Sequence, residues 1–237
     1  MVDTTTSQEL LVKNADRVVP IASITKLMTA MVVLDANLPL GEMLKVTEED
    51  RDYLMGTGSR LRIGWALSRE DMLHLALMSS ENRAAAALSR YYPGGRPAFI
   101  AAMNLKAAQL GMSETHFVNA NGLTPENVST ALDLARLVRG AAQYPLIRNF
   151  TTDPRYKVRI GRHSLGYINS NRLVGRPDWD IEVQKTGFTN EAGDCVVMQL
   201  NSHGRALIMV FLDANGKLTR FADARRVVTQ LAKAEPR

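Results

Sequence analysis

The sequence feature that most constrains the fold is a helical stretch that is apolar on almost every side. Within it, Lys26 is the only charged residue between Arg17 and Asp35. A helix with so broad an apolar face needs protein around it, because its side chains would otherwise lie in water. We therefore predict a buried helix over residues 23–36, with Ser23 at its start, where serine is a favoured cap.

The order of the other predicted elements indicates a mixed α/β fold. The predicted strands are residues 8–13, 156–160, 163–167, 181–185, 195–200 and 206–212. The other predicted helices are residues 68–78, 82–91, 97–110, 129–138 and 220–232. A strand, a block of helices, several antiparallel strands and a last helix predict one antiparallel sheet flanked by helices. Both chain ends would complete this sheet, with a helical lobe inserted between them.

We expect one domain over residues 1–237, because no repeat, low-complexity tract or linker interrupts the chain. The sheet lobe would take about residues 1–22 and 151–237, and the helical lobe about residues 23–150. The chain ends one helix after its last predicted strand. No C-terminal β-domain is therefore expected, although a truncated chain would look the same.

Charge and metal-binding residue types exclude several classes of function. The net charge is +5 and the pI about 9.5, but the basic residues are scattered, so we expect no nucleic-acid partner. The single Cys195 cannot form an internal disulfide. The four histidines lie far apart and form no His-x-x-x-His pair, so we expect no metal and no zinc hydrolase. We expect no cofactor.

The chain shows no sequence signal for a membrane. Its longest apolar stretches, residues 30–34 and 206–212, are much shorter than the ~20 residues of a transmembrane helix. Residues 1–6 are polar and lack the basic and apolar regions of a signal peptide. A cytoplasmic protein and a processed mature form both remain open.

Ser23 and Lys26 are the first candidates for chemistry. A Ser-x-x-Lys pattern is expected by chance about once in a chain of this length, and a capped helix with a lysine in its first turn explains it equally well. The spacing of three puts the amine and the hydroxyl on one helix face, and the helix start favours a developing anion. Burial would disfavour the protonated amine. Ser23 is thus the candidate nucleophile and Lys26 its candidate base.

Two further short motifs follow along the chain. Lys185-Thr186-Gly187 is a tripeptide expected by chance on the order of once in 5,000 positions. We predict it at the end of a strand, where Gly187 would let a backbone or a substrate approach closely, or would simply form a turn. Ser80 and Asn82 flank one residue between two predicted helices, where helix capping alone could explain both.

Taken together, the motifs resemble the Ser-x-x-Lys, Ser-x-Asn and Lys-Thr-Gly set of penicillin-binding proteins and serine β-lactamases. Ser80 lies 57 positions after Ser23, and Lys185 a further 105 positions on, which is similar to the spacing in that family. Residues 115–123 resemble the Phe-x-Asn-x-x-Gly-Leu signature of the D-alanyl-D-alanine carboxypeptidase family. The Gly-x-Ser-x-Gly elbow of other serine hydrolases is missing.

Within this superfamily, a β-lactamase is disfavoured, because Glu126 and its neighbours do not match the Glu-x-x-Leu-Asn motif of class A enzymes. Residues 20–36, 75–86 and 185–193 are most similar to the penicillin-binding protein 7/8 type. Members of that type are periplasmic D-alanyl-D-alanine endopeptidases that cut peptidoglycan cross-links. The resemblance, rather than the motif chemistry, favours an endopeptidase over a carboxypeptidase, because the motifs serve both.

The resemblance implies a monomeric, periplasmic serine D,D-peptidase that acts on peptidoglycan stem peptides and cross-links through an acyl-enzyme. It implies cleavage between D-Ala and meso-diaminopimelate, and covalent inhibition by β-lactams. The implied catalytic residues are Ser23, Lys26, Ser80, Asn82 and Lys185, and the implied substrate-binding residues are Thr186, Gly187, Phe188 and Arg220. A carboxypeptidase, a class A-like β-lactamase and a non-hydrolysing β-lactam sensor remain as alternatives.

These residues have distinct expected roles. Ser80 would relay a proton to the leaving amine, and Asn82 would orient Lys26. The backbone N–H groups of Ser23 and Phe188 would form the oxyanion hole. A free lysine has a pKa near 10.4, so base catalysis needs a fall of roughly 3 from burial and from the nearby charge of Lys185.

Overall fold

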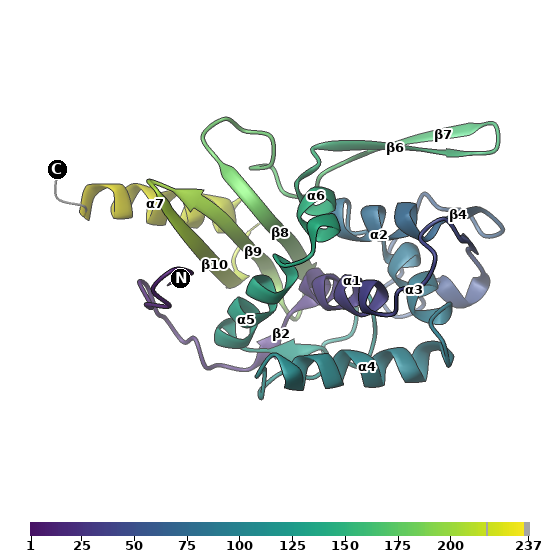
Figure 1. The fold of residues 1–237 in the computed structure, drawn as a ribbon, viewed down its shortest axis with the longest axis horizontal. Coiled ribbons are helices and arrows are strands. Elements are labelled where there is room, and N and C mark those ends of the chain that lie inside the picture. The colour runs from purple at the N-terminus through teal and green to yellow at the C-terminus, as the bar shows by residue number, and fades with distance from the viewer. Residues whose placement is uncertain (217, 235–237) are drawn as a thin grey trace.

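The computed structural model describes residues 1–216 and 218–234, with a four-stranded antiparallel sheet beside a larger group of helices (Figure 1). The strand order is β1-β10-β9-β8, and every neighbouring pair is antiparallel. These strands are β1 (Val2–Asp3), β8 (Asp180–Thr189), β9 (Gly193–Ser202) and β10 (Arg205–Ala214). The predicted mixed α/β class is confirmed.

Tight turns join the three long strands. His203 and Gly204 connect β9 to β10 and both have positive φ (+49° and +73°), as a two-residue hairpin turn requires. Gly193, with φ +63°, follows the turn from β8 to β9. The predicted strand 181–185 is too short, because β8 continues to Thr189. The Lys-Thr-Gly motif therefore lies inside a strand and not at its end.

The predicted central helix is confirmed as α1 (Thr25–Asp35), preceded by the short 3-10 helix η1 (Ala22–Ile24). Every α1 residue through Val33 is buried. Helices pack around it on several sides (Figure 1). They are α2 (Arg69–Met78), α3 (Asn82–Arg90), α4 (Gly95–Gln109), α5 (Ala131–Ala141) and α6 (Pro145–Thr152). Full burial of each large apolar side chain stabilises the fold by about 1.5–3 kcal/mol.

Side-chain caps fix where two of these helices begin. The Ser68 hydroxyl accepts the Asp71 N–H at 3.0 Å and begins α2. Thr130 does the same for α5 through the Asp133 N–H, at 3.1 Å. Both caps confirm the predicted starts. Ser23, in contrast, is not a cap: it lies inside η1, and its side chain is free for other partners.

The N-terminal segment differs from its prediction. Residues 8–13 form no strand: Glu9 makes a single bridge to Val2, and Leu11 and Val12 are exposed. The Met1 carbonyl accepts the Leu10 N–H at 2.9 Å, so the segment folds back over β1 instead of extending the sheet. The sequence pattern of two polar and then three apolar residues also lacks strand alternation.

A separate hairpin, β6 (Arg155–Ile160) with β7 (His163–Ile168), was expected within the main sheet and does not join it. It follows α6, which the sequence did not predict, and projects past α2 (Figure 1). On one face Tyr156 stacks on His74, and its hydroxyl donates to Asp71 at 2.7 Å. The hairpin therefore covers the helices, with its charged residues on the outer side.

The sheet has a core on each face. On one face, Phe221, Ala224 and Val227 of α7 (Thr219–Ala234) pack against apolar side chains of β9 and β10. On the other face the α1 region packs against the sheet. The predicted last helix is thus confirmed. The single-domain assignment and its lobe boundaries stay a prediction.

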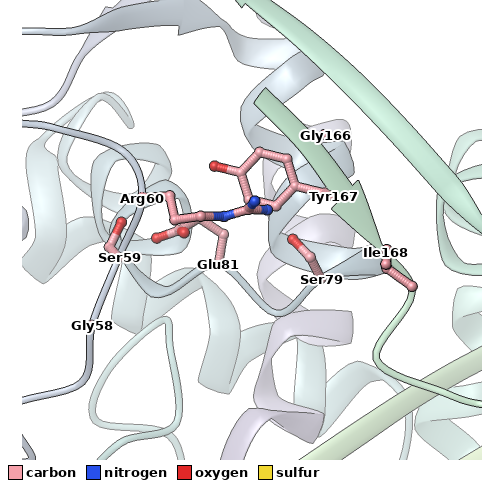
Figure 2. A pocket seen from close by; sticks show the side chains of 8 residues that line it. All are labelled: Gly58, Ser59, Arg60, Ser79, Glu81, Gly166, Tyr167 and Ile168. Carbon is pink, nitrogen blue, oxygen red and sulfur yellow. The ribbon is translucent and has the colours of Figure 1, made fainter. Parts of the chain in front are cut away.

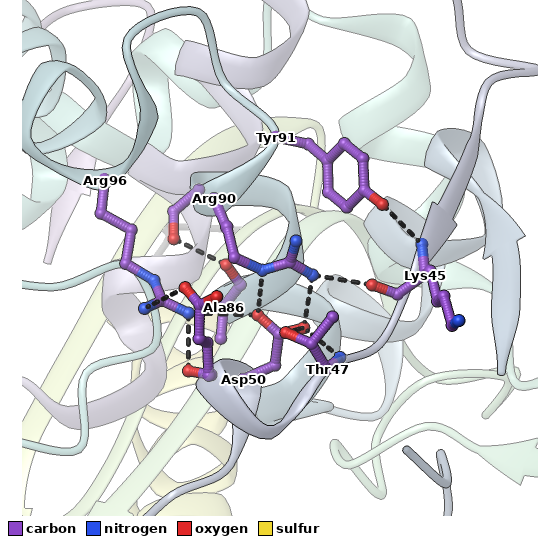
Figure 3. Close-up of polar contacts among 9 residues, drawn as sticks. Lys45, Thr47, Asp50, Ala86, Arg90, Tyr91 and Arg96 are labelled. Atoms are coloured by element: carbon purple, nitrogen blue, oxygen red, sulfur yellow. Dashed lines mark hydrogen bonds and ion pairs between the residues drawn. The ribbon is translucent and has the colours of Figure 1, made fainter. Parts of the chain in front are cut away.

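Short elements complete the fold, two of them at the start of α1 and the others beside α2 and α3. They are β2 (Val19–Pro20) paired with β5 (Val128–Ser129), β3 (Met43–Lys45) paired with β4 (Ala66–Ser68), and the 3-10 helix η2 (Glu48–Asp50). The buried Asp50 carboxylate accepts two hydrogen bonds from the Arg90 guanidinium, at 2.7 and 3.0 Å, and one from the Arg96 guanidinium, at 3.2 Å (Figure 3). These contacts anchor the beginning of the long loop over residues 51–65.

Candidate active site

The structure brings the first and second motifs into direct contact at the start of α1. Lys26 Nζ lies 2.7 Å from Ser23 Oγ and 2.8 Å from Asn82 Oδ1. The third neighbour of this amine is the backbone carbonyl of Asn121, at 2.7 Å. Lys26 is fully buried, whereas Ser23 keeps 8% of its surface exposed. A nearly buried hydroxyl that keeps some exposure is thus backed by a fully buried amine.

These three neighbours suit a neutral lysine. An uncharged amine has two N–H donors and one lone pair. The carbonyl oxygens of Asn82 and Asn121 can only accept, so they take the two N–H groups. The lone pair of Lys26 is then left for the hydroxyl proton of Ser23, which is the geometry of a base beside a nucleophile.

Burial lowers the pKa of Lys26 from 10.5 to about 7, and the nearby Glu81 carboxylate opposes this change. The value is close to what the sequence reasoning required of a base at neutral pH. Burial was predicted to lower this pKa and does so. The charge of Lys185, the second predicted cause, is not needed for the change.

The backbone around Ser23 is strained. Ala22 has φ +47° and Ser80 has φ +63°, a region that costs a residue with a side chain about 1–3 kcal/mol. Gly122 has φ +77°, and a Cβ there would overlap the Ala22 carbonyl oxygen and come within 2.9 Å of Thr25 Oγ1. The segment that carries Asn121 is therefore pressed directly against η1. This contact holds the Asn121 carbonyl over Lys26.

The third motif borders Ser23 from the side of the sheet. A Cβ added to Gly187 would lie 3.2 Å from the Ser23 nitrogen and 3.1 Å from the Ile21 oxygen. Glycine therefore lets β8 run against η1, as predicted for a close approach. Phe188 follows with a side chain that is 51% exposed. Its role in an oxyanion hole stays a prediction.

Lys185 is fully buried, and its Nζ donates to the Thr186 carbonyl at 2.9 Å. Burial, with the positive charges of Lys26 and Arg220, holds the pKa of Lys185 well below its usual range. The Thr186 hydroxyl donates to Ser170 Oγ at 2.7 Å. The strand that borders Ser23 thus carries a lysine amine that can take up a proton and, next to it, a threonine hydroxyl.

Arg220 was predicted to bind substrate, and the structure gives it protein partners. Its Nη1 donates to the carbonyls of Gly187 at 2.8 Å and Cys195 at 2.9 Å, and lies 3.1 Å from Asp194 Oδ1. The guanidinium thus braces β8 against β9 at the Lys-Thr-Gly motif. A direct substrate contact stays a prediction.

Two site residues were not predicted. Asn121 was within reach of sequence analysis, because it belongs to the segment over residues 115–123 that resembles a family signature. Thr57, whose hydroxyl accepts Asn82 Nδ2 at 3.0 Å, lies in an irregular loop with no motif to mark it. Ser80 lies in the turn between α2 and α3, next to these groups in the chain.

Two kinds of feature are absent from residues 1–216 and 218–234. Within them, no three His, Cys, Asp or Glu side chains gather in a group that could hold a metal ion. No helix of the described chain is long and apolar enough to cross a membrane.

A serine hydroxyl bonded to a buried lysine of low pKa, beside a strand with a second buried lysine, is the site of a serine acyl-transfer enzyme of the Ser-x-x-Lys class. The chain belongs to the D-alanyl-D-alanine carboxypeptidase family, whose model matches residues 1–216. The predicted family is therefore confirmed.

Similar proteins agree with this membership. The chain is 52% identical over 227 residues to a D-alanyl-D-alanine endopeptidase of Pseudomonas aeruginosa, covering 95% of this chain and 73% of the relative. It is 50% identical over 231 residues to that of Escherichia coli, covering 97% and 74%. Among solved structures, the Streptomyces K15 DD-transpeptidase matches with a TM-score of 0.89 and 27% identity, covering 99% and 95%. The ampicillin-bound penicillin-binding protein D2 of Listeria monocytogenes matches with 0.83 and 32%, covering 96% and 93%.

Proposed function

We propose that this protein is a serine D,D-endopeptidase that cleaves the bond between D-Ala and meso-diaminopimelate in peptidoglycan cross-links. The observation that carries the proposal is the buried Lys26 amine, which lies 2.7 Å from Ser23 Oγ. Its two N–H groups are taken by the oxygens of Asn82 and Asn121. The two relatives at 52% and 50% identity, both named D-alanyl-D-alanine endopeptidases, support this substrate class over others in the family.

In the first half of the reaction, Ser23 Oγ attacks the D-Ala carbonyl carbon while its proton moves to Lys26 Nζ. The backbone N–H groups of Ser23 and Phe188 stabilise the resulting oxyanion. The C–N bond then breaks, Ser80 passes its proton to the leaving amine, and Ser80 takes the proton from Lys26, so Lys26 is neutral again. This leaves the D-Ala acyl group as an ester on Ser23.

In the second half, water attacks the ester carbonyl and the Ser23–carbonyl bond breaks. Lys26 takes the water proton and returns one to Ser23 Oγ, so the enzyme is restored and the acyl-side stem peptide leaves with a free carboxylate on its D-Ala. Asn82 keeps the amine of Lys26 in place throughout. Lys185 and Thr186 hold the carboxylate next to the amine that leaves, because Lys185 gains a proton when an anion approaches.

A D,D-carboxypeptidase that removes terminal D-Ala is the second candidate. Carboxypeptidases of the family match this chain too, with 28% identity for the Bacillus subtilis relative, and the site chemistry serves both reactions. Incubation with cross-linked muropeptide dimers and with pentapeptide monomers separates them. Conversion of dimers to monomers supports the endopeptidase, and loss of only terminal D-Ala contradicts it. The Ser23→Ala variant is the control and should do neither.

We also propose that β-lactams acylate Ser23. The neighbouring Listeria protein D2 has ampicillin-bound and cefotaxime-bound forms, which supports the proposal for the same fold. Intact-mass analysis and peptide mapping after exposure to penicillin should place one adduct on Ser23. An adduct that clears in seconds would instead indicate a β-lactamase, and an acylated enzyme that releases no peptide product would indicate a sensor.

Peptidoglycan as substrate requires a location outside the cytoplasmic membrane, and we propose the periplasm. We propose that the enzyme acts there as a monomer without a cofactor. Size-exclusion chromatography with light scattering tests the monomer, and fractionation of cells that express the natural gene tests the location.

A further inference from the structure

A pocket of about 570 Å³ is lined by residues on both sides of Ser80, and Figure 2 shows its walls. Its walls come from the loop that contains Ser59 and Arg60, from the turn with Ser79 and Glu81, and from the end of β7. Glu81 stands between the two residues of the Ser-x-Asn motif, and its charge reaches Lys26. When a substrate is bound at Ser23, the residue before its D-Ala can therefore reach this pocket.

Charges of opposite sign line the pocket. The Arg60 guanidinium lies over the Tyr167 ring, 3.9 Å from its centroid, and no ion pair joins Arg60 to a carboxylate within the described chain. Glu81 lies beneath them, and one of its carboxylate oxygens accepts the Arg83 N–H at 3.1 Å (Figure 2). A cation and an anion thus share one small pocket without being paired to each other.

Tyr167 adds an observation that points to a ligand. Its ring is 4% exposed, and the Arg60 guanidinium, which can only donate, lies near its hydroxyl oxygen, while no acceptor for the hydroxyl proton lies in the described part of the chain. Buried polar groups nearly always use their donors, so a hydroxyl proton without an acceptor in a pocket wall calls for an acceptor from outside. Burial raises the pKa of Tyr167 to about 12, so the hydroxyl keeps its proton and needs an acceptor.

We propose that this pocket is a subsite for a zwitterionic amino-acid group, an ammonium and a carboxylate on one carbon, carried by the acyl-side stem peptide. The carboxylate would bind Arg60 and the Tyr167 hydroxyl, and the ammonium would bind Glu81. This inference rests on the proposed function, because the free end of a diaminopimelate side chain is such a group. Its methylene chain would lie along Ile168 and the turn at Ser79.

The test compares two cross-linked peptide dimers that are cut at the same D-Ala bond. One has diaminopimelate in the acyl-side stem, and the other has lysine, which keeps the ammonium but lacks the carboxylate. The wild type should prefer the first by about tenfold or more in kcat/KM, and Arg60→Gln should reduce this preference to about one. Because the readout is a ratio on one enzyme, partial loss of folded protein cancels.

Arg62→Gln is the matched control, because Arg62 lies on the same loop but stacks on Trp65, outside the pocket. It should keep the wild-type preference. The subsite is overturned if the wild type shows no preference, if Arg60→Gln keeps it, or if Arg62→Gln loses it to the same degree.

Competition with a fluorescent penicillin separates this proposal from the proposed function. If neither dimer is cut, the endopeptidase proposal fails, and the subsite is then judged by protection of Ser23 from labelling. Stronger protection by the diaminopimelate peptide, lost in Arg60→Gln, supports the subsite. Equal protection by the two peptides overturns it.

A second, independent arrangement lies behind Asn82. The Thr57 hydroxyl accepts from Asn82 Nδ2 at 3.0 Å and donates to Asp52 Oδ2 at 2.7 Å. The Asp52 carboxylate also accepts backbone N–H groups of Leu54 and Met55, at 2.9 and 3.0 Å. A carboxylate held by so many donors is ionised and can only accept.

The direction of each bond then follows. The Thr57 proton belongs to Asp52, so toward Asn82 the hydroxyl can only accept, and the amide must turn its NH₂ group to Thr57. The amide oxygen of Asn82 therefore faces Lys26. We propose that Thr57 and Asp52 are positioning residues that lock this amide orientation, which leaves the Lys26 lone pair to Ser23.

Thr57→Val removes the hydroxyl at nearly constant volume, and Thr57→Ser keeps it. A released amide can turn its NH₂ group to Lys26, where it binds the lone pair and opposes the ammonium. Thr57→Val should therefore lower the plateau rate of Ser23 acylation by about tenfold and move the pH midpoint of acylation lower. Thr57→Ser should restore both. An unchanged plateau and midpoint in Thr57→Val, or a fall in plateau with no shift in midpoint, overturns the proposal.

Discussion

The site contains two fully buried lysines that come from different parts of the molecule and have different surroundings. Lys26, at the start of α1, has three oxygen neighbours within 2.8 Å. Lys185, in the middle of β8, donates to one carbonyl and lies near two other basic groups. Burial alone therefore does not define what a lysine in this site does.

The difference lies in the partners that remain available. The neighbours of Lys26 are two fixed carbonyl oxygens and a hydroxyl, so its neutral form is fully hydrogen-bonded. With a pKa of about 7, it exchanges its proton readily at neutral pH. Among the described residues, the Lys185 amine donates to one carbonyl only, and its charged form has no anionic partner. A base and an anion-binding group thus result from the same residue type, and their roles are separately testable.

The largest expected effect is that of Lys26→Ala. Removal of the base should slow acylation of Ser23 by penicillin by about 10³-fold or more. The protein should stay folded, since the substitution also removes a buried ionisable group whose charged form is costly there. Stopped-flow or gel-based acylation, with thermal unfolding as the control, measures both. Acylation at the normal rate would show that another group is the base.

Lys185→Gln should have a smaller and substrate-dependent effect. Loss of the cation should reduce kcat/KM by about 10²-fold for substrates with a carboxylate next to the leaving amine. The same peptide with an amidated carboxylate is the control, and the variant should lose much less on it. An equal loss of kcat/KM on both peptides would contradict the anion-binding role of Lys185. Its effect would then not differ between substrates, as expected for Lys26.

Gly122→Ala tests the contact that holds the Asn121 carbonyl over Lys26. The added Cβ meets the Ala22 carbonyl oxygen, so the free energy of unfolding should fall by about 2–4 kcal/mol in urea titrations. Gly161→Ala is the matched control, because Gly161 also has positive φ (+57°) but open space around it. Its loss should be about 1 kcal/mol. Equal losses would show that backbone conformation, and not contact with η1, accounts for the effect.

Phe188→Ala should have the smallest effect. Only the backbone N–H of this residue has a proposed role, and the side chain is half exposed. The acylation rate should change less than about twofold. A loss of about tenfold would show that the phenyl ring itself binds substrate, and would sharpen the description of the β8 side of the site.

The parts of the fold that sequence could predict are those with local causes. The broad apolar pattern predicts α1, and the caps at Ser68 and Thr130 predict α2 and α5. The separate β6–β7 hairpin and the course of residues 8–13 were wrong or incomplete, because tertiary packing decides whether a strand joins a sheet. α6 was missed since a helix of 8 residues gives a weak periodic signal.

The candidate site divides in the same way. Ser23, Lys26 and Asn82 stand in short motifs and could be found, and the structure brings their side chains together. Thr57 contacts the site through a hydrogen bond to Asn82, 25 positions away in the chain. The Asn121 carbonyl does so through a hydrogen bond to Lys26, 95 positions away. A backbone carbonyl carries no residue signature, and a loop threonine is too common to be singled out. Such contacts follow from the fold and not from local pattern.

The most direct test of the account is the pH dependence of Ser23 acylation. Neutral Lys26 is the active form, so the rate should be highest above the pKa of about 7 and fall about tenfold for each pH unit below it. Lys185→Gln should keep a midpoint near neutrality, and Lys26→Ala should lose the titration with the activity. A rate that stays constant from about pH 5 to about pH 9 in the wild type would contradict the assignment of Lys26 as the base.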